Sequence, residues 1–165
     1  MKRFAVAALL VLSGCDTGPT PEEQALSDAR DVAMVEEANE VMPPLEEVTP
    51  EPILLPDIER YDLYGMACNY APGTSLGTRV VSREADAFVK IEGEVHRFAA
   101  DPGSRELPMH TRTLYNGKEY SLRLAINGEP EPESDGTTSY EGSVTLRDRY
   151  GRVVYEGTGL AQCKA

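Results

Sequence analysis

The chain has no tryptophan, only two histidines and three cysteines, and aromatic residues make up 7% of its 165 residues. With so few large aromatic side chains, the folded part can build only a modest hydrophobic core. The histidines stand in no His-Glu-x-x-His or Cys/His spacing, which argues against a zinc site. A Gly-x-Ser-x-Gly motif and a glycine-rich phosphate loop are also missing. We therefore expect a protein that is not an enzyme and that holds no metal or cofactor.

Positive charge is scarce too. The chain carries 16 Lys and Arg residues against 28 Asp and Glu, a formal net charge of −12. The imbalance is concentrated in residues 16–59, where thirteen acidic residues accompany one basic residue, Arg30. Residues 60–165 hold fifteen acidic and thirteen basic residues and are nearly neutral. The sequence has no Lys and Arg cluster that could bind a phosphate backbone, so we expect no nucleic-acid partner.

No apolar run approaches the roughly 18 residues that a membrane span needs. The longest, residues 4–12, follows a basic start at residues 2–3 and leads into Leu-Ser-Gly-Cys at residues 12–15. A charged start, a short apolar core and small residues before the cut form an export signal, which predicts a signal peptide over residues 1–14. The Leu-Ser-Gly-Cys stretch resembles the lipobox of bacterial lipoproteins.

This resemblance implies that Cys15 becomes the mature N-terminus and carries a diacylglycerol thioether and an acylated amine, with chains such as palmitate. Several acyl chains, at about 0.8 kcal/mol per buried methylene, give stable membrane attachment. Asp16 resembles the signal that keeps lipoproteins of enteric bacteria in the inner membrane. We thus expect a lipid-anchored protein of the cell envelope that faces the periplasm, with Asp16 favouring the inner membrane. The alternative is a secreted protein that is cut near Gly14 and keeps a free thiol.

An odd number of cysteines in an exported protein leaves one thiol to explain. If Cys15 carries lipid, Cys68 and Cys163 can pair, and we predict a disulfide between them. It would close a loop of nearly the whole folded region, which corresponds to about 4–5 kcal/mol in the chain-entropy description. Because there is no Cys-x-x-Cys motif, a structural bridge is favoured over a redox-active one.

Residues 15–57 are predicted to be an acidic spacer, rich in Pro and Glu and without aromatic residues, that is mostly disordered. Within it, residues 20–23, Thr-Pro-Glu-Glu, have the pattern of a capped helix start, and Met-Pro-Pro at residues 42–44 is a stop. These signals predict a helix over residues 21–40. Its apolar stripe is weak, so we interpret it as a solvated spacer, with a partner-docking arm as the alternative. The stretch 43–56 is predicted to be extended.

Residues 58–165 have the pattern of an all-β domain, a small antiparallel barrel or sandwich of about eight strands. Alternating runs such as Leu122, Leu124 and Ile126 give each strand one face for a core. Asn116-Gly117 and Glu92-Gly93 predict tight hairpins between neighbouring strands. The predicted strands are Tyr61–Tyr70, Thr78–Arg83, Ala87–Ile91, Val95–Ala99, Met109–Leu114, Glu119–Ile126, Ser139–Leu146 and Arg152–Gln162.

Two resemblances concern this domain. Its stretches at residues 57–60 (Asp-Ile-Glu-Arg), 63–68 (Leu-Tyr-Gly-Met-Ala-Cys), 97–101, 115–124 and 151–156 look like a family of small, uncharacterised exported proteins of sphingomonad-type alphaproteobacteria. That likeness would cover about residues 53–165 and implies no activity. The second is architectural, because lipoprotein inhibitors of C-type lysozyme are also small β-barrels with a Cys near each end. Their inhibitory motifs, Ser-Gly followed by Tyr and a Tyr-Trp-Thr-Lys run, are absent from this chain.

Few residues could carry chemistry. His96 lies within a predicted strand, where a packed or solvated role is the ordinary one, and His110 stands in no recognisable motif. The stretch 129–136 holds Glu129, Glu131, Glu133 and Asp135, which could bind Ca²⁺ weakly but is favoured as a solvated loop. The eight tyrosines are interpreted mainly as sheet packing, with a tyrosine-lined binding face as the alternative.

The sequence therefore predicts a lipid-anchored cell-envelope protein that serves as a non-catalytic binding or structural module. Its expected partners are the membrane, through lipid on Cys15, and a protein of the envelope. One alternative is an inhibitor or binder of an envelope enzyme such as lysozyme. A further alternative is a small periplasmic enzyme, which would require His96 or His110 to cluster with carboxylates in a pocket.

Overall fold

The computed structural model describes residues 18–40, 42–133 and 135–165, so the predicted signal peptide, Cys15 and Asp16 lie outside the described residues. The chain divides into two compact units, residues 1–44 and residues 45–165. The described part contains no helix that combines the length and the apolar character needed to cross a membrane.

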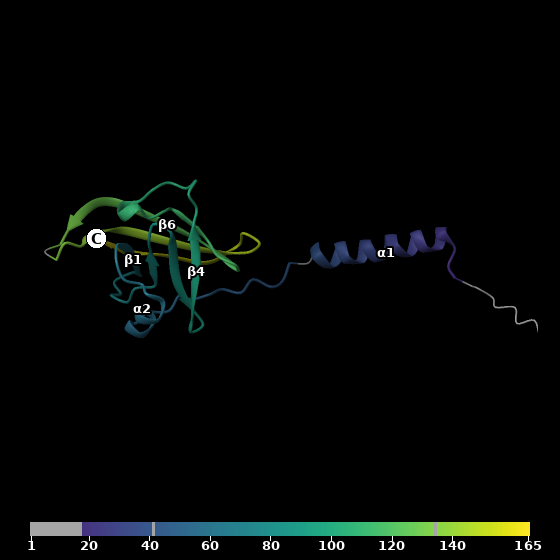
Figure 1. The fold of residues 1–165 in the computed structure, drawn as a ribbon, viewed down its shortest axis with the longest axis horizontal. Coiled ribbons are helices and arrows are strands. Elements are labelled where there is room, and N and C mark those ends of the chain that lie inside the picture. Colours follow the sequence, from purple (N-terminus) through teal and green to yellow (C-terminus); the bar gives the residue numbers. More distant parts are fainter. Residues whose placement is uncertain (1–17, 41, 134) are drawn as a thin grey trace, which may run out of the picture. The chain divides into compact units, whose positions relative to one another are not determined.

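The first unit contains one helix, α1 (Pro21–Glu40), at the position that the capping pattern predicts (Figure 1). The Thr20 hydroxyl accepts a hydrogen bond from the Glu23 amide at 3.3 Å, and the Glu23 carboxylate accepts one from the Thr20 amide at 2.9 Å. This reciprocal pair satisfies amides that a helix start leaves free. Residues 21–39 are all exposed within the described structure, as expected for a solvated helix.

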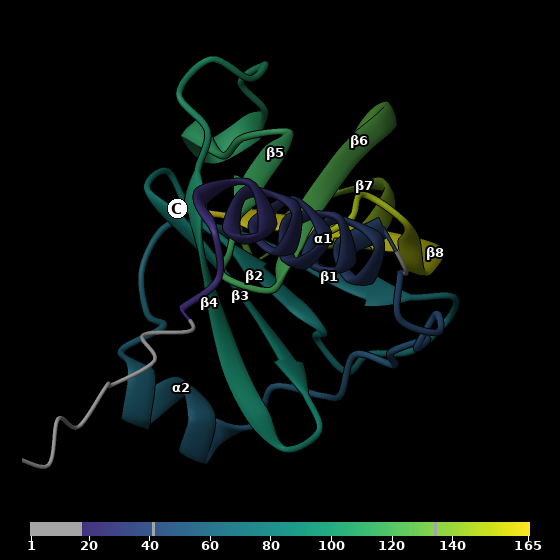
Figure 2. The same cartoon turned by 90° about the vertical axis from the view of Figure 1, so that its right-hand side faces the viewer.

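The second unit is a closed barrel of eight antiparallel strands, which confirms the predicted all-β class and strand number (Figures 1 and 2). Each strand pairs with the next along the chain, and the last pairs with the first. A short helix precedes the barrel and a 3₁₀ turn interrupts it. The elements are α2 (Leu55–Tyr61), β1 (Ala67–Pro72), β2 (Val80–Ser82), β3 (Asp86–Ile91), β4 (Glu94–Ala100), η1 (Pro108–His110), β5 (Leu114–Asn116), β6 (Tyr120–Pro132), β7 (Thr138–Asp148) and β8 (Val153–Lys164).

The barrel interior holds the main hydrophobic core, and strand alternation selects its members. Leu122 and Leu124 of β6, for example, point inward and are almost completely buried, whereas Arg123 between them is exposed. The core consists of Tyr70, Val80, Ala87, Val89, Ile91, Phe98, Leu107, Tyr115, Leu122, Leu124, Val144, Leu146 and Val154. With three aromatic rings among thirteen side chains, this core is small, as the composition predicts.

A second core lies outside the barrel, between its wall and the chain that precedes β1. It consists of Ile53, Leu63, Ala67, Val81, Phe88 and Val95, with Ile58 of α2 packed against it. Residues of β2, β3 and β4 are therefore buried on both faces of the sheet, and residues 53–67 form the cover.

The predicted disulfide is present. Cys68 of β1 and Cys163 of β8 are direct partners in the antiparallel pairing, their Cα atoms are 4.0 Å apart, and the bond joins positions 95 residues apart. Because β1 and β8 are the first and last strands, the bond fastens the seam where the barrel closes.

The predicted boundary at residue 58 is wrong, because the barrel unit begins at residue 45. Three backbone hydrogen bonds tie the preceding stretch to the barrel: the Val48 amide to the Val154 carbonyl at 3.0 Å, Glu51 to Lys90 at 2.7 Å and Ile53 to Thr78 at 2.8 Å. The stretch 43–56, predicted to be extended, contains no helix up to residue 54 and lies along the barrel wall, but its last two residues, Leu55 and Pro56, begin α2. The spacer thus ends about a dozen residues earlier than the composition suggested.

Two predicted strands are also wrong in part. The first half of Tyr61–Tyr70 is replaced by the end of α2 and a turn, since Asp62 takes the left-handed conformation (φ 51°) that ends the helix. Of the predicted strand Met109–Leu114 only Leu114 lies in β5, and its start is the 3₁₀ turn η1, where Met109 and His110 both have positive φ, 59° and 58°. Pro108 has no amide for a strand ladder, which explains why the chain turns there.

The two predicted hairpins form, one of them with a different turn. Glu92 and Gly93 both have positive φ and join β3 to β4 in the expected two-residue turn. Neither Asn116 nor Gly117 has positive φ, so the predicted turn type is wrong there. The connection runs over residues 117–119 instead and is closed by a hydrogen bond from the Gly117 amide to the Tyr120 carbonyl at 2.8 Å.

Candidate functional site

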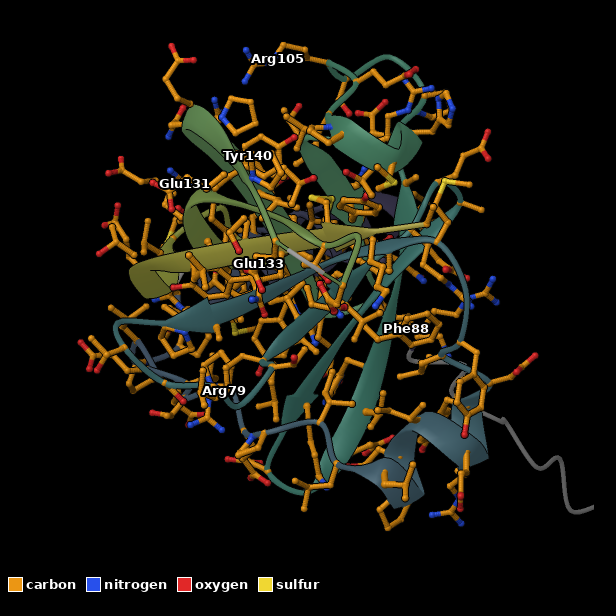
Figure 3. The ribbon with its side chains drawn as sticks, turned by 90° about the vertical axis from the view of Figure 1, so that its left-hand side faces the viewer. Arg79, Phe88, Arg105, Glu131, Glu133 and Tyr140 are labelled. Carbon is orange, nitrogen blue, oxygen red and sulfur yellow. A yellow bond between two sulfur atoms is a disulfide. The ribbon has the colours of Figure 1, made fainter. Side chains whose placement is uncertain are left out.

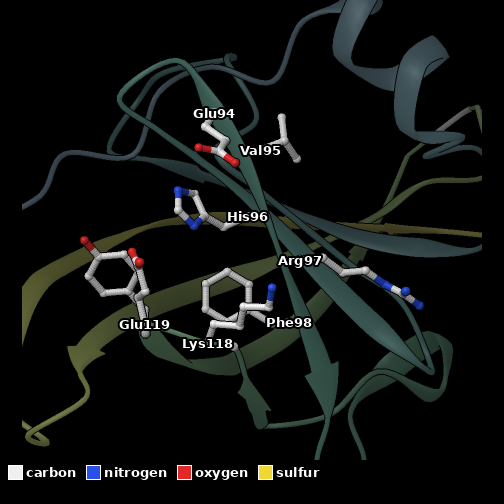
Figure 4. A pocket seen from close by; sticks show the side chains of 9 residues that line it. Glu94, Val95, His96, Arg97, Phe98, Lys118 and Glu119 are labelled. Atoms are coloured by element: carbon white, nitrogen blue, oxygen red, sulfur yellow. The ribbon is translucent and has the colours of Figure 1, made fainter.

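The candidate site is a hollow in the barrel wall between β4 and the turn that joins β5 to β6. It has a volume of about 240 Å³ and is lined on one side by residues 94–98 and on the other by residues 117–120. Figure 4 shows its side chains, with Glu94 and His96 on the β4 side and Glu119 on the opposite side.

The hollow exists because β4 and β5 separate early. Only Ala99 and Ala100 of β4 pair with β5, whereas β4 pairs with β3 from Glu94 to Ala99. The chain then turns at Gly117, where a Cβ atom would lie 3.0 Å from the Phe98 ring. A glycine at this position lets the turn pack on Phe98, which closes one end of the hollow and leaves the rest of β4 uncovered.

Two aromatic rings meet across the hollow. His96 of β4 and Tyr120 of β6 contact each other edge to face, with ring centroids 5.9 Å apart and planes at 75°. His96 therefore lies in a strand as a half-buried packing residue, in agreement with the sequence-based interpretation. Arg97 points away from the hollow, where its guanidinium binds Asp86 at 2.9 Å on the outer face (Figure 4).

The surroundings of Tyr120 are acidic. Burial raises the pKa of the Tyr120 hydroxyl, and the carboxylates of Glu119, Glu92 and Glu46 raise it further, against a smaller opposite effect of Arg149. Glu94 adds another carboxylate to the lining, and Lys118 adds one ammonium group. None of Glu46, Glu92, Glu94 or Glu119 makes a salt bridge or a side-chain hydrogen bond within the described part of the chain. The four carboxylates outnumber Lys118 and Arg149, so this end of the barrel presents net negative charge beside aromatic rings.

His110 lies elsewhere, on the loop that contains η1. Its Nδ1 is 2.8 Å from the Glu106 carboxylate, which also contacts the Arg112 guanidinium at 3.4 Å. His110 does not line the hollow that contains His96. The structure thus does not bring the two histidines together in one pocket.

The acidic stretch 129–136 forms the end of the β6–β7 hairpin, where Figure 3 labels Glu131 and Glu133. Asp135 binds Lys164 at 2.9 Å and Thr137 at 3.0 Å, and these contacts lower its pKa to about 2. Glu133 binds Ser139 and, at 3.1 Å, Gln162. The carboxylates of Asp135 and Glu133 thus bind different protein groups, and no three His, Cys, Asp or Glu side chains converge on a metal-sized space in the described ranges.

Some of the tyrosine side chains pack in the core, and others lie on the surface. Tyr115 is fully buried, donates a hydrogen bond to the Arg83 carbonyl at 2.9 Å and accepts one from the Arg112 amide at 2.7 Å. Tyr70 is also buried, and burial raises the pKa of its hydroxyl. Tyr61, Tyr64 and Tyr150 are exposed. Tyr120 lines the hollow, so a binding face uses one tyrosine of β6 together with His96.

No protein-family model, no curated protein and no solved structure matches this chain. A function must therefore be inferred from its residues and their geometry. The sequence pointed to His96 but missed Glu94, Glu119 and Tyr120 as its neighbours. No local signal could have found them, because they meet only where β4 and β5 diverge.

Proposed function

We propose that this protein is a lipid-anchored, non-catalytic binding module of the bacterial cell envelope. The lipobox-like stretch ending at Cys15 supplies the anchor, and Asp16 favours the inner membrane. The acidic segment with α1 acts as the spacer. The barrel unit, residues 45–165, is the part that meets a partner.

The observation that carries the binding role is the acidic, aromatic-lined hollow at β4. Among the described residues its carboxylates make no salt bridge or side-chain hydrogen bond, and the His96–Tyr120 aromatic pair lines the same hollow. Groups of this kind recognise cations well, because an ammonium or guanidinium group gains from both the ring faces and the carboxylates. A basic segment of an envelope protein therefore fits this surface better than an anionic or apolar ligand.

The placement of the histidines favours a binding module over an enzyme. His96 packs against the Tyr120 ring, and His110 pairs with Glu106, four residues earlier in the loop around η1 and outside the hollow. General acid–base catalysis needs a base aligned with a nucleophile or a substrate proton, and in the part of the chain that the structure describes neither histidine is hydrogen-bonded to a Ser, Thr or Cys side chain.

The first prediction concerns the anchor. Replacing Cys15 by Ser removes the thiol that carries the lipid, so the exported protein is expected in the soluble periplasmic fraction while the unchanged protein stays with membranes. Fractionation of cells that express the two forms, followed by immunodetection, measures the difference. Asp16→Ser serves as a control for the membrane choice, since it keeps the lipid. Retention of the Cys15→Ser form by membranes would contradict the lipoprotein assignment.

Affinity capture from the organism's own envelope tests the binding role. The wild-type protein, solubilised in mild detergent, should retain a basic protein whose binding weakens as salt increases. If no protein is enriched over a stalk-only bait of residues 15–44, the binding role is wrong.

A second candidate function is the inhibition of an envelope enzyme such as lysozyme, and the loop around η1 favours it. Met109 and His110 are consecutive residues with left-handed backbone, a costly arrangement that persists only where surrounding contacts hold it. Leu107 anchors the loop in the core, and its amide bonds to the Thr111 carbonyl at 2.8 Å. A loop held in one conformation loses little entropy on entering an enzyme cleft.

This candidate gives a direct prediction for an enzyme assay. Excess wild-type protein should slow peptidoglycan hydrolysis by a C-type lysozyme at least tenfold, and His110→Ala should restore most of the rate. Met66→Ala, an exposed position outside the loop, should inhibit like the wild type. An unchanged hydrolysis rate with the wild-type protein would exclude the inhibitor role for this enzyme class.

A further inference from the structure

One edge of β4 is unpaired where it borders the hollow. Residues 94–98 pair with β3 on one side, but in the described structure no strand pairs with them on the other. Neighbouring residues of a strand direct their backbone groups to opposite sides. The Ala100 amide bonds to Ala85 on the β3 side, and the Asp101 amide bonds to Leu114 on the β5 side. By this alternation, Arg97 and Val95 direct their amides and carbonyls into the opening.

This edge of β4 differs from another uncovered edge of the barrel, that of β6. β6 pairs with β5 only over Ser121–Arg123 and so has its own uncovered edge further along. That edge contains Pro130 and Pro132 and a register shift between Asn127 and Glu131. Proline and irregular pairing protect strand edges from additional strands. Residues 94–98 contain no proline, and their pairing with β3 has no register shift.

The side chains beside the β4 edge suit one kind of residue. A residue added opposite His96 would point to the same side of the sheet as His96, toward the Tyr120 ring. There it would meet the carboxylates of Glu94 and Glu119, which make no salt bridge among the described residues. A Lys or Arg side chain at this position meets aromatic rings and carboxylates together.

We propose that an extended, basic segment of a partner protein adds as a strand to the free edge of β4, pairing with Val95 and Arg97 and placing a Lys or Arg side chain beside the His96–Tyr120 pair. The proposal rests on the binding role proposed above and specifies the partner's chemistry. Backbone hydrogen bonds supply the affinity, and the basic side chain supplies the specificity. The hollow, at about 240 Å³, has room for one such side chain.

The test uses the full mature chain with Cys15→Ser, which is soluble by the prediction above. The probe is the peptide acetyl-Thr-Val-Lys-Val-Thr-amide, titrated against ¹⁵N-labelled protein by NMR. We expect the amide signals of Val95 and Arg97 to move most and to gain protection from exchange. A peptide with the same side chains and N-methyl groups on the β4-facing amides should bind at least tenfold more weakly, because it cannot form the ladder.

Two double variants distinguish the contribution of the carboxylates in the hollow to peptide binding from that of carboxylates elsewhere on the surface. Glu94→Gln with Glu119→Gln should weaken peptide binding at least tenfold, whereas Glu129→Gln with Glu131→Gln, at the end of β6, should change it less than twofold. The proposal is overturned if the largest shifts lie on β6 to β8, if N-acetyl-lysine methylamide binds as tightly as the peptide, or if the N-methylated peptide binds equally well. Absence of any shift at millimolar peptide also overturns it.

The envelope capture distinguishes this outcome from failure of the binding role. If the strand-addition proposal alone is wrong, the Glu94→Gln, Glu119→Gln protein captures the same partner as the wild type. If the binding role is wrong, neither protein captures one.

Discussion

Removal of the Cys68–Cys163 disulfide is expected to lower the free energy of unfolding of the barrel by about 4–5 kcal/mol. The bond joins positions 95 residues apart, so its loss frees most of the unfolded barrel unit from a long loop constraint. A domain of this size has a total stability on the order of 5–15 kcal/mol. The Cys68→Ala, Cys163→Ala protein should therefore be close to unfolding at physiological temperature. Its melting temperature should fall by roughly 15–20 °C.

Urea denaturation followed by circular dichroism measures this effect. Chemical reduction of the unchanged protein should give the same loss, which separates the missing bond from the effect of the alanine side chains. Cys15→Ser is the matched control, because it removes a cysteine that is not expected to form the bond, and it should keep full stability. Labelling of Cys68 or Cys163 by a thiol reagent in unreduced, denatured protein would show that the bond does not form.

The sequence correctly predicted the elements that depend on residues close together in the chain. The start of α1 follows from Thr20 and Glu23, which lie three residues apart and bond to each other. The long hairpins of β6 to β8 follow from strand alternation, and their inward residues form the core as expected. Pairing of Cys68 with Cys163 followed from counting the cysteines, once one of them is assigned to lipid.

The cover on the outer wall could not be predicted, because it depends on contacts between distant residues. Strand alternation gave each strand one face for a core, but Phe88 and Val95, on the other face, are buried as well. They pack with Ile53, from the predicted spacer, and with Leu63, from the predicted strand Tyr61–Tyr70. A salt bridge between Asp57 of α2 and Lys90 of β3, at 2.9 Å, adds a polar contact to the same packing. Composition alone could not reveal that this proline-rich stretch has a surface to pack on.

The candidate site depends on a mismatch in strand length. β4 has seven residues and β5 has three, so β4 extends beyond its neighbour and leaves the hollow. The opening lies past the C-terminal end of β5, because Ala99 pairs with Asn116 and the chain then turns at Gly117 instead of continuing along β4. The sequence predicted a turn at Asn116-Gly117 but not the register of β4 and β5 that places this turn beside Phe98, because the register depends on residues that are far apart in the chain.

Gly159→Ala is expected to destabilise the barrel by about 3 kcal/mol, at the upper end of the range for overpacking. A Cβ at this position would lie 2.1 Å from the Ala71 carbonyl oxygen and 2.7 Å from the Gly73 amide nitrogen. Both are backbone atoms, so no side-chain rotation can relieve the clash and β1 must move away from β8. Gly159 pairs with Pro72 at the opposite end of the β1–β8 ladder from the disulfide. The seam is thus held by a covalent bond at one end and by close backbone contact at the other.

Chemical denaturation compares Gly159→Ala with Gly103→Ala, which serves as the control. In the control, the new Cβ would meet only the Asp101 side chain, at 3.3 Å, in an exposed loop away from the seam, so stability should change by less than about 0.5 kcal/mol. Because both changes add one methyl group to a glycine, they reduce the freedom of the unfolded chain equally, and their difference reports the folded seam. Equal denaturation midpoints for the two variants would contradict the close packing of β1 against β8 at Gly159. If the seam is a cooperative unit, Gly159→Ala in reduced protein should leave no folded barrel, because the two losses together approach the whole stability of the domain.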